Sequence, residues 1–280
     1  MVIEQERMSD IRKPAVAGYF YPSDPVKLND ELETLLAISK PRESVEDVIG
    51  LISPHAGYIY SGRTAAYAYN LIKKKNVKTV IIISPSHREY FPGISIYKGD
   101  AYSTPLGVIR INKKMAAKLI SGSKNIFIGT QGHKDEHGIE VQIPFLQKVI
   151  SDFEIVPIVM GDQSSFNIEE LASKLADAAD DNTVIIASSD LSHFHTKDEA
   201  DALDSIVERR ISEFDYETLQ SDLEVQRCEA CGGGPIVAMM KAADLINKRH
   251  SLVLHRSDSS NSSGDTSEVV GYLSAVVYGG

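Results

Sequence analysis

The sequence predicts an α/β fold made of a single domain, with a mixed sheet flanked by helices. Three short runs rich in valine and isoleucine have the composition of strands that are buried on both faces. They are residues 48–53 (VIGLIS), 79–84 (TVIIIS) and 183–188 (TVIIAS). Segments with helical periodicity alternate with such runs through most of the chain, which is typical of parallel strands joined by helical crossovers.

The other elements follow from the same alternation. Further strands are expected at residues 94–97, 155–160, 253–255 and 269–278, and the polar segment 257–268 is expected to be a loop. Helices are expected at residues 28–36, 63–74, 113–120, 136–150, 168–179 and 197–214, and a last one ends near Asn247. Pro235 falls in the first turn of that last helix, where its missing N–H costs little. Pro144 lies inside segment 136–150 and predicts a kink or a restart there.

Composition limits the classes of function. The chain has 280 residues and carries 29 basic and 39 acidic side chains, a net charge of −10. This balance argues against nucleic acid as the main partner, because phosphate binding needs a basic surface. No apolar run is long enough to span a membrane, and two cysteines are too few for a disulfide scaffold, so a cytoplasmic location is expected. Residues 1–11 are expected to form a flexible extension before one domain, residues 12–280.

Polar side chains follow each of the three apolar runs. His55 comes just after the first, His87 just after the second, and Asp190 and His193 just after the third. In open α/β sheets, ligands bind at the carboxyl edge of the strands. Repeated placement of imidazoles at that edge favours a metal or catalytic site, although each histidine could instead cap a helix or hydrogen-bond within a loop.

Other residues near these motifs are candidates for the surroundings of the site. Asp190 and His193 could be metal ligands, a carboxylate that orients an imidazole, or an acid/base pair, but an Asx turn beside a surface histidine is also compatible. Tyr58 and Tyr60 flank the first motif and either line a pocket or pack within a loop. We expect His137 or Glu140 to contribute at the mouth of the site.

The segment His133 to His137 (HKDEH) suggests a different hypothesis. It matches the pattern H-x-x-E-H, which in one class of zinc peptidase places two histidine ligands one helical turn apart with a glutamate base between them. The pattern works only on a continuous helix. Gly132 and Gly138 border the segment and weigh against such a helix.

The two cysteines form a single C-x-x-C pair, Cys228 and Cys231, followed by three glycines. One pair without a second argues against a structural zinc site. Cys231 is expected at the start of a helix, where the helix dipole lowers the pKa of a thiol. A thiolate with two imidazoles would make an open three-ligand site for a soft metal. Cys228 is expected to be a small buried residue.

Seven motifs, in order from residue 12 to 278, give the chain a family resemblance. They are RKPAVAGYFYP (12–22), SPHAGYIYSG (53–62), SPSH (84–87), EHGIEVQIPFLQ (136–147), SSDLSHF (188–194), CGGGPI (231–236) and VVGYLS (269–274). Together they resemble the Memo family in its prokaryotic form. The resemblance implies a fold like that of class III extradiol dioxygenases, which use non-haem Fe(II).

The resemblance also implies a site. The family's two histidines and one cysteine fall on His55, His87 and Cys231, and Asp190 and His193 match accompanying pocket positions. Eukaryotic members are described as binding iron or copper, taking part in redox chemistry and engaging a phosphotyrosine-containing peptide. Prokaryotic members are often encoded near a radical SAM protein, which implies a functional link to such a partner.

One departure from the dioxygenase pattern limits what can be transferred. Those enzymes use two histidines and a carboxylate, whereas here the third ligand would be a thiolate, which is softer and can be oxidised. Ring cleavage therefore does not carry over. Two hypotheses remain. The first is a metal-dependent oxidoreductase of unknown substrate that uses Fe(II) or copper, with zinc also compatible. The second is a non-catalytic module that binds a small molecule or peptide, or that chelates copper or iron. In the first, Asp190, His193 and Cys231 take part in catalysis.

Overall fold

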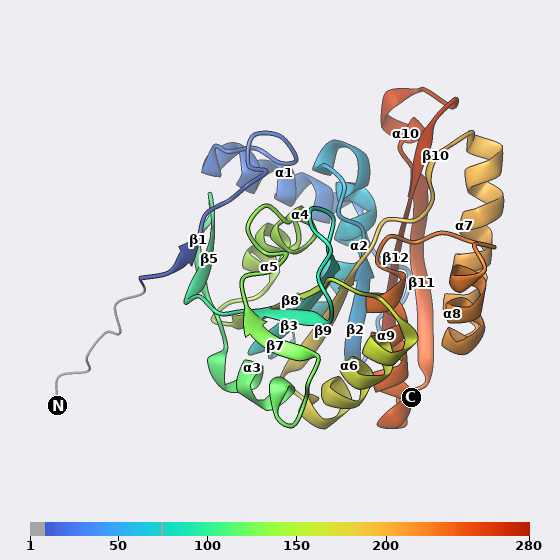
Figure 1. Ribbon diagram of the computed structural model, residues 1–280. Coiled ribbons are helices and arrows are strands. Elements are labelled where there is room, and N and C mark those ends of the chain that lie inside the picture. The colour runs from blue at the N-terminus through green and yellow to red at the C-terminus, as the bar shows by residue number, and fades with distance from the viewer. Residues whose placement is uncertain (1–8, 74) are drawn as a thin grey trace.

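The computed structural model of the chain describes residues 9–73 and 75–280 (Figure 1). The strands of its large sheet are β2 (Val48–Ser53), β3 (Thr79–Pro85), β4 (Ile94–Tyr97), β7 (Ile126–Gly129), β8 (Glu154–Met160), β9 (Thr183–Ser188), β10 (His193–His195), β11 (His250–Asp258) and β12 (Val269–Tyr278). Their order is β10-β12-β2-β9-β3-β8-β4-β7, and β11 pairs with β12 beside this path. A separate small sheet has the order β1 (Ile11–Arg12), β5 (Ala101–Thr104), β6 (Gly107–Arg110).

Helices cover both faces of the large sheet. One face is covered by α1 (Pro25–Ile38), the π-helical turn η1 (Tyr58–Gly62), α2 (Arg63–Ile72), α4 (His137–Glu140) and α5 (Gln142–Val149). The other is covered by α3 (Lys113–Ile120), α6 (Ser165–Ala178), α7 (Lys197–Ser212), α8 (Tyr216–Glu224) and α9 (Gly233–Leu245). A short helix, α10 (Ser260–Ser263), lies between β11 and β12. The mixed sheet flanked by helices is therefore confirmed.

The central strands are buried on both sides, as their composition predicts. In β3, Val80 and Ile82 belong to one apolar cluster, whereas Ile81 and Ile83 belong to the cluster on the opposite face. This alternation follows from the two-residue repeat of a strand. β2, β9, β3 and β8 run parallel to one another, while β12 runs antiparallel to β2, which makes the sheet mixed.

Strand register determines which loops meet at the carboxyl edge. Ser53 of β2 pairs with Ser188 of β9, and Ala187 of β9 pairs with Ile83 of β3. The three strands therefore end side by side. The loops that carry His55, Asp190 and His87 consequently emerge next to each other, as predicted for this edge.

Several elements differ from the sequence-based expectation. Segment 136–150 restarts at Val141, so Pro144 lies in the first turn of α5, where no helical hydrogen bond is lost. Strand β11 is longer than residues 253–255, and α8, β7 and the small sheet were not predicted. Helix α2 ends at Ile72, and residue 74 lies outside the described part of the chain.

The predicted N-terminal extension is described only from residue 9 onward. Ser9 and Asp10 donate their backbone N–H groups to the carboxylate of Asp100, and β1 pairs in parallel with β5. The remainder of the predicted extension, residues 1–8, lies outside the described residues. Among the helices that the structure describes, none combines the length and apolar character needed to cross a membrane.

Candidate metal centre

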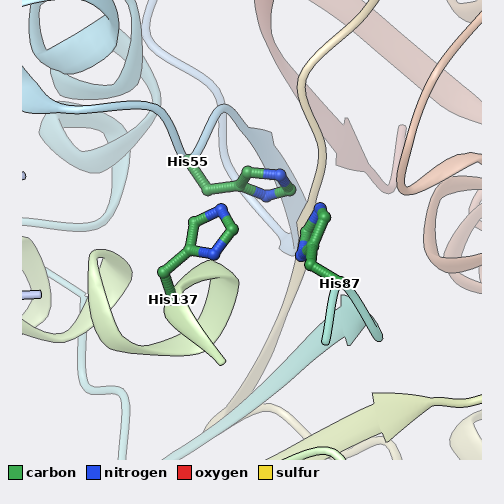
Figure 2. A group of neighbouring side chains, drawn as sticks. All are labelled: His55, His87 and His137. Atoms are coloured by element: carbon green, nitrogen blue, oxygen red, sulfur yellow. The ribbon is translucent and has the colours of Figure 1, made fainter. Parts of the chain in front are cut away.

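Three histidine rings converge at the carboxyl edge of the sheet (Figure 2). His55 follows β2, His87 follows β3, and His137 is the first residue of α4. One ring nitrogen from each lies within 4.8 Å of the others, and the ring centroids are separated by 4.5 to 5.2 Å. This spacing fits three ligands of a single metal ion. Of these rings, His55 and His87 were predicted as ligands and His137 as a residue at the mouth of the site.

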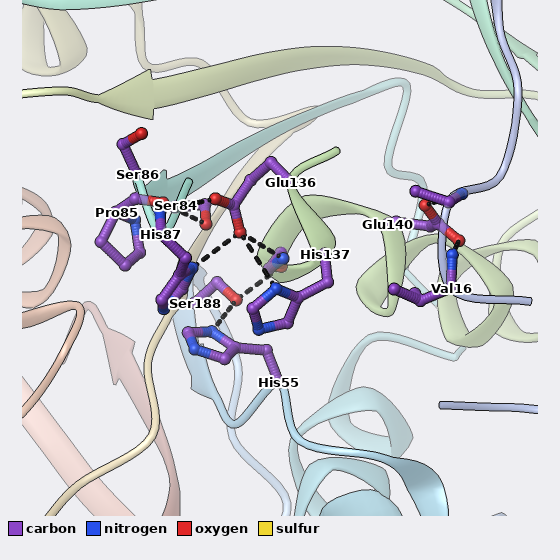
Figure 3. A network of polar contacts seen from close by, with 12 residues as sticks. Val16, His55, Ser84, Pro85, Ser86, His87, Glu136, His137, Glu140 and Ser188 are labelled. Carbon is purple, nitrogen blue, oxygen red and sulfur yellow. Dashed lines mark hydrogen bonds and ion pairs between the residues drawn. The ribbon is translucent and has the colours of Figure 1, made fainter. Parts of the chain in front are cut away.

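A buried carboxylate sets the orientation of His87. Oε1 of Glu136 lies 2.8 Å from Nδ1 of His87, and Oε2 accepts the backbone N–H of His87 at 2.8 Å (Figure 3). Glu136 is fully buried, but these bonds and the N–H of Gly138 outweigh burial and lower its pKa to about 2. An ionised carboxylate can only accept, so Nδ1 of His87 carries a hydrogen and Nε2 is the ring nitrogen left to bind a metal.

A serine hydroxyl sets the orientation of His55 in a similar way. Oγ of Ser188 donates its only hydrogen to the carbonyl oxygen of Gly138 at 2.6 Å, and it accepts from Nε2 of Gln142 at 2.8 Å. The same oxygen lies 2.9 Å from Nδ1 of His55. Because the hydroxyl hydrogen is already used, Nδ1 of His55 must be the donor. The lone pair of His55 is therefore on Nε2, the ring nitrogen that faces Sγ of Cys231.

Burial favours the neutral, metal-binding state of His55 and His137. Burial, helped by the neighbouring His87, lowers the pKa of His55 to about 3. Burial likewise lowers the pKa of His137 to about 4, and the nearby His55 acts in the same direction. Nδ1 of His137 is buried and has no hydrogen-bond partner among the described residues. This nitrogen lies 3.6 Å from Oε1 of Glu136, and imidazole nitrogens gathered in this way are suitable ligands for a transition metal.

Cys231 places a sulfur donor next to one of the three rings, that of His55, and is not itself part of the three-histidine group. Its Sγ lies 3.2 Å from Nε2 of His55 and 3.2 Å from the backbone nitrogen of Asp190. The expectation that the helix dipole lowers its pKa is wrong for the metal-free site. Helix α9 begins two residues later, at Gly233, and burial together with the Asp190 carboxylate raises the pKa of the thiol. A bound cation would be needed to hold the thiolate.

Asp190 and His193 both reach the site, in different ways. Oδ1 of the buried Asp190 accepts the backbone N–H of His55 at 2.7 Å, and burial raises the pKa of this carboxyl group. His193 lies in the wall between two cavities. One, of about 520 Å³, also touches His137 and Asp190, and the other, of about 640 Å³, also touches Cys231.

Two predicted pocket residues serve the packing of the protein instead. Glu140 is fully buried and accepts hydrogen bonds from Arg12, from the backbone of Ala15 and Val16, and from the hydroxyl of Tyr21. It thereby ties the N-terminal segment to α4, on the side away from the histidines (Figure 3). The side chain of Tyr58 is buried, and its hydroxyl donates to the carbonyl oxygen of Val141.

The peptidase hypothesis for His133 and His137 is wrong. Residues 130–136 form turns, and α4 begins only at His137, so no helix carries both rings. Nδ1 of His133 pairs with the hydroxyl of Tyr102 at 2.9 Å, and its Nε2 lies 3.2 Å from the carbonyl oxygen of Ser95. His133 is thus a buried core histidine. Cys228 is also buried, as expected, and both cysteines are free.

Comparisons with known proteins identify the family of this chain. The model of the Memo-like protein family matches residues 12–276. A MEMO1 family protein of Thermoplasma volcanium is 39% identical over 269 residues, covering 95% of this chain and 98% of that protein. A second, from Thermoplasma acidophilum, is 41% identical over 271 residues, with the same coverage.

A solved structure shares the fold. The crystal structure of an uncharacterized protein from Escherichia coli K12 superposes with a TM-score of 0.51 at 12% identity, covering 82% of this chain and 99% of that one. At this identity the likeness concerns the fold alone. The family match and the archaeal relatives span nearly the whole chain. This chain therefore belongs to the Memo family.

Proposed function

We propose that this protein is a metal-dependent oxidoreductase whose iron or copper ion is held by His55, His87 and Cys231. The observation that carries the proposal is that hydrogen bonds occupy Nδ1 of both His55 and His87, which leaves Nε2 of each ring as the nitrogen for a metal. Protein scaffolds use such outer partners to prepare imidazoles for a metal. His137 supplies a third imidazole within the same group.

The donor set favours a redox-active metal. Imidazole and thiolate ligands suit copper and iron, and they also accept zinc. When bound, iron or copper would supply one-electron chemistry and a coordination position for O₂ or a substrate. The thiol of Cys231 must lose its proton for this role. Its raised pKa therefore predicts that metal uptake releases a proton and improves as the pH rises.

The remaining site residues position the metal ligands and a substrate. Asp190 holds the loop of His55 through the backbone N–H of that residue. His193 borders both cavities and so is placed to exchange a proton with a substrate that enters from either side. The two unpaired cysteines are typical of a reducing compartment, which supports a cytoplasmic location.

Metal analysis of untagged protein, purified without chelators, tests the site. We expect near-stoichiometric iron or copper in the wild type, and loss of that metal when His55 and His87 are both changed to alanine. Cys231→Ser should abolish the thiolate charge-transfer absorption of the oxidised metal form. His250→Ala removes an exposed histidine of β11 and should change neither result. Full metal retention in the double variant would refute the proposal.

Oxygen consumption separates catalysis from metal carriage. The metal-loaded protein should consume O₂ with a suitable reductant such as a catechol, and the His193→Gln variant should be slower at unchanged metal content. Stoichiometric metal without any O₂ consumption would instead indicate a carrier or chelator.

A further inference from the structure

The 520 Å³ cavity has a lining of unusual composition. Its lining includes His137, Asp190 and His193. Other parts of its wall come from the N-terminal turn, η1, β10, β12 and the segment around α10. Aromatic side chains dominate this wall. They are Tyr19, Phe20, Tyr60, Phe194 and Tyr272.

Several of these side chains are exposed in a way that folding alone does not explain. Tyr19 is 88% exposed and Phe194 is 73% exposed, while Tyr272, which also lines the cavity, is buried. Grouped exposed apolar side chains are typical of a binding surface. They offer ring faces to whatever enters the cavity.

The backbone at Phe194 is unfavourable for its residue type. Phe194 has a φ of 61°, in the left-handed region that a bulky residue rarely adopts. It lies where the pairing of β10 with β12 is irregular, between His193 and His195. Strain of this kind persists where a site needs it. Here the strained residue is Phe194, whose aromatic side chain lines the cavity.

The charged groups of the wall are acidic. Asp190, Asp265 and Glu268 line the cavity, and no lysine or arginine does so among the described residues. Asp265 accepts hydrogen bonds from the backbone and hydroxyl of Ser267, which lower its pKa and keep it ionised.

We infer that this cavity binds a small organic cation, an ammonium group carried on an apolar or aromatic body. Aromatic faces attract such cations through their quadrupoles, and carboxylates at the rim add charge complementarity. The same carboxylates repel a phosphorylated or carboxylate-bearing ligand. The inference rests on the proposed function only in assigning this cation as the substrate that reaches the three histidines; binding itself needs no metal.

Three probes with similar bodies and different charges test the inference in metal-free protein by calorimetry. They are 2-phenylethylamine (cationic), 2-phenylethanol (neutral) and 3-phenylpropionate (anionic). We expect the amine to bind at least about tenfold more tightly than the propionate, with the alcohol in between. Added salt should weaken the amine more than the alcohol. Equal or tighter binding of the propionate, or no binding of the amine, would overturn the inference.

Variants locate the cation within the cavity. Asp265→Asn combined with Glu268→Gln should remove most of the preference for the amine and leave the affinity for the alcohol nearly unchanged. Tyr19→Leu keeps apolar surface but removes a ring face, so it should weaken the amine more than the alcohol. Asp181→Asn removes the same charge from an exposed position before β9, at the opposite edge of the sheet, and should have no effect.

Failure of this inference can be distinguished from failure of the proposed metal site. Asp265 and Glu268 lie outside the three-histidine group, so their double variant should retain the metal content of the wild type. If the protein binds the amine but takes up no metal, the cation site is supported and only the proposed metal site is refuted. A double variant that prefers the amine as strongly as the wild type does would refute the cation site.

Discussion

Glu136 and His87 are joined twice, because one carboxylate oxygen accepts the ring Nδ1–H of His87 and the other accepts its backbone N–H, both at 2.8 Å. Glu136→Gln should therefore disturb His87 without changing the size of the side chain. The new amide NH₂ would oppose one of the N–H donors of His87. We expect metal affinity to fall about 10- to 100-fold, as is usual when the outer partner of a ligand is lost. Competition with a chromogenic chelator measures this change.

The stability of the metal-free Glu136→Gln variant serves as its control. If Glu136 acts by positioning His87, affinity should fall much more than the thermal stability of the metal-free form. Unchanged affinity would show that Glu136 has no part in preparing the ligand.

Gly138 is the point of closest approach between α4 and the strand ends. A Cβ at this position would overlap Oγ of Ser84 and would lie 3.3 Å from Nδ1 of His55. Gly138→Ala should shift either α4 or His55, with loss of metal and of about 1–3 kcal/mol of stability. Gly57→Ala is a suitable comparison, because its Cβ would meet nothing nearer than 3.5 Å. Metal titration and chemical denaturation of both variants check this prediction.

Glu140→Gln separates a packing role from a role in the site. The substitution leaves the buried guanidinium of Arg12 without its charged partner. We expect a loss of about 3 kcal/mol of stability, which is typical of a broken buried ion pair. Metal content should remain normal in the folded variant, since Glu140 faces away from the histidines. Loss of metal without loss of stability would show that Glu140 contributes to metal binding and not to packing.

The metal-free protein should lose stability in mild acid. Burial lowers the pKa of His55 and of His133 to about 3 and that of His137 to about 4. The unfolded chain, with ordinary values near 6.5, therefore binds more protons than the folded chain below that pH. The stabilising contribution is complete above pH 6.5 and decreases by about 1.4 kcal/mol per pH unit for each such histidine as the pH falls towards the folded values.

Urea denaturation of metal-free protein at pH 7.5 and 5.5 measures this effect. The free energy of unfolding should be clearly lower at pH 5.5. Equal values at the two pH settings would mean that these histidines are not buried in neutral form.

The strand-end histidines were predictable because local composition identifies buried strands and the order of the chain places polar residues after them. The role of Glu140 was not, because its partner Arg12 is 128 residues away in the sequence. The burial of Cys231, and with it the raised pKa of its thiol, could not be predicted from the sequence either, because it depends on contact with the loop after β9. Ser188 and Gln142 gave no local signal, because their function follows from a hydrogen-bond geometry that only the folded chain shows.

The position of β12 has a consequence for the biosynthesis of the protein. Residues 275–278 of β12 pair with β2, which leads into the loop of His55, and Tyr272 of β12 lines the aromatic cavity. On the ribosome, β2 emerges more than two hundred residues before this neighbour. Contacts so distant in sequence form late. The pairing of β2 with β12 can therefore be completed only after residues 275–278 have been synthesised.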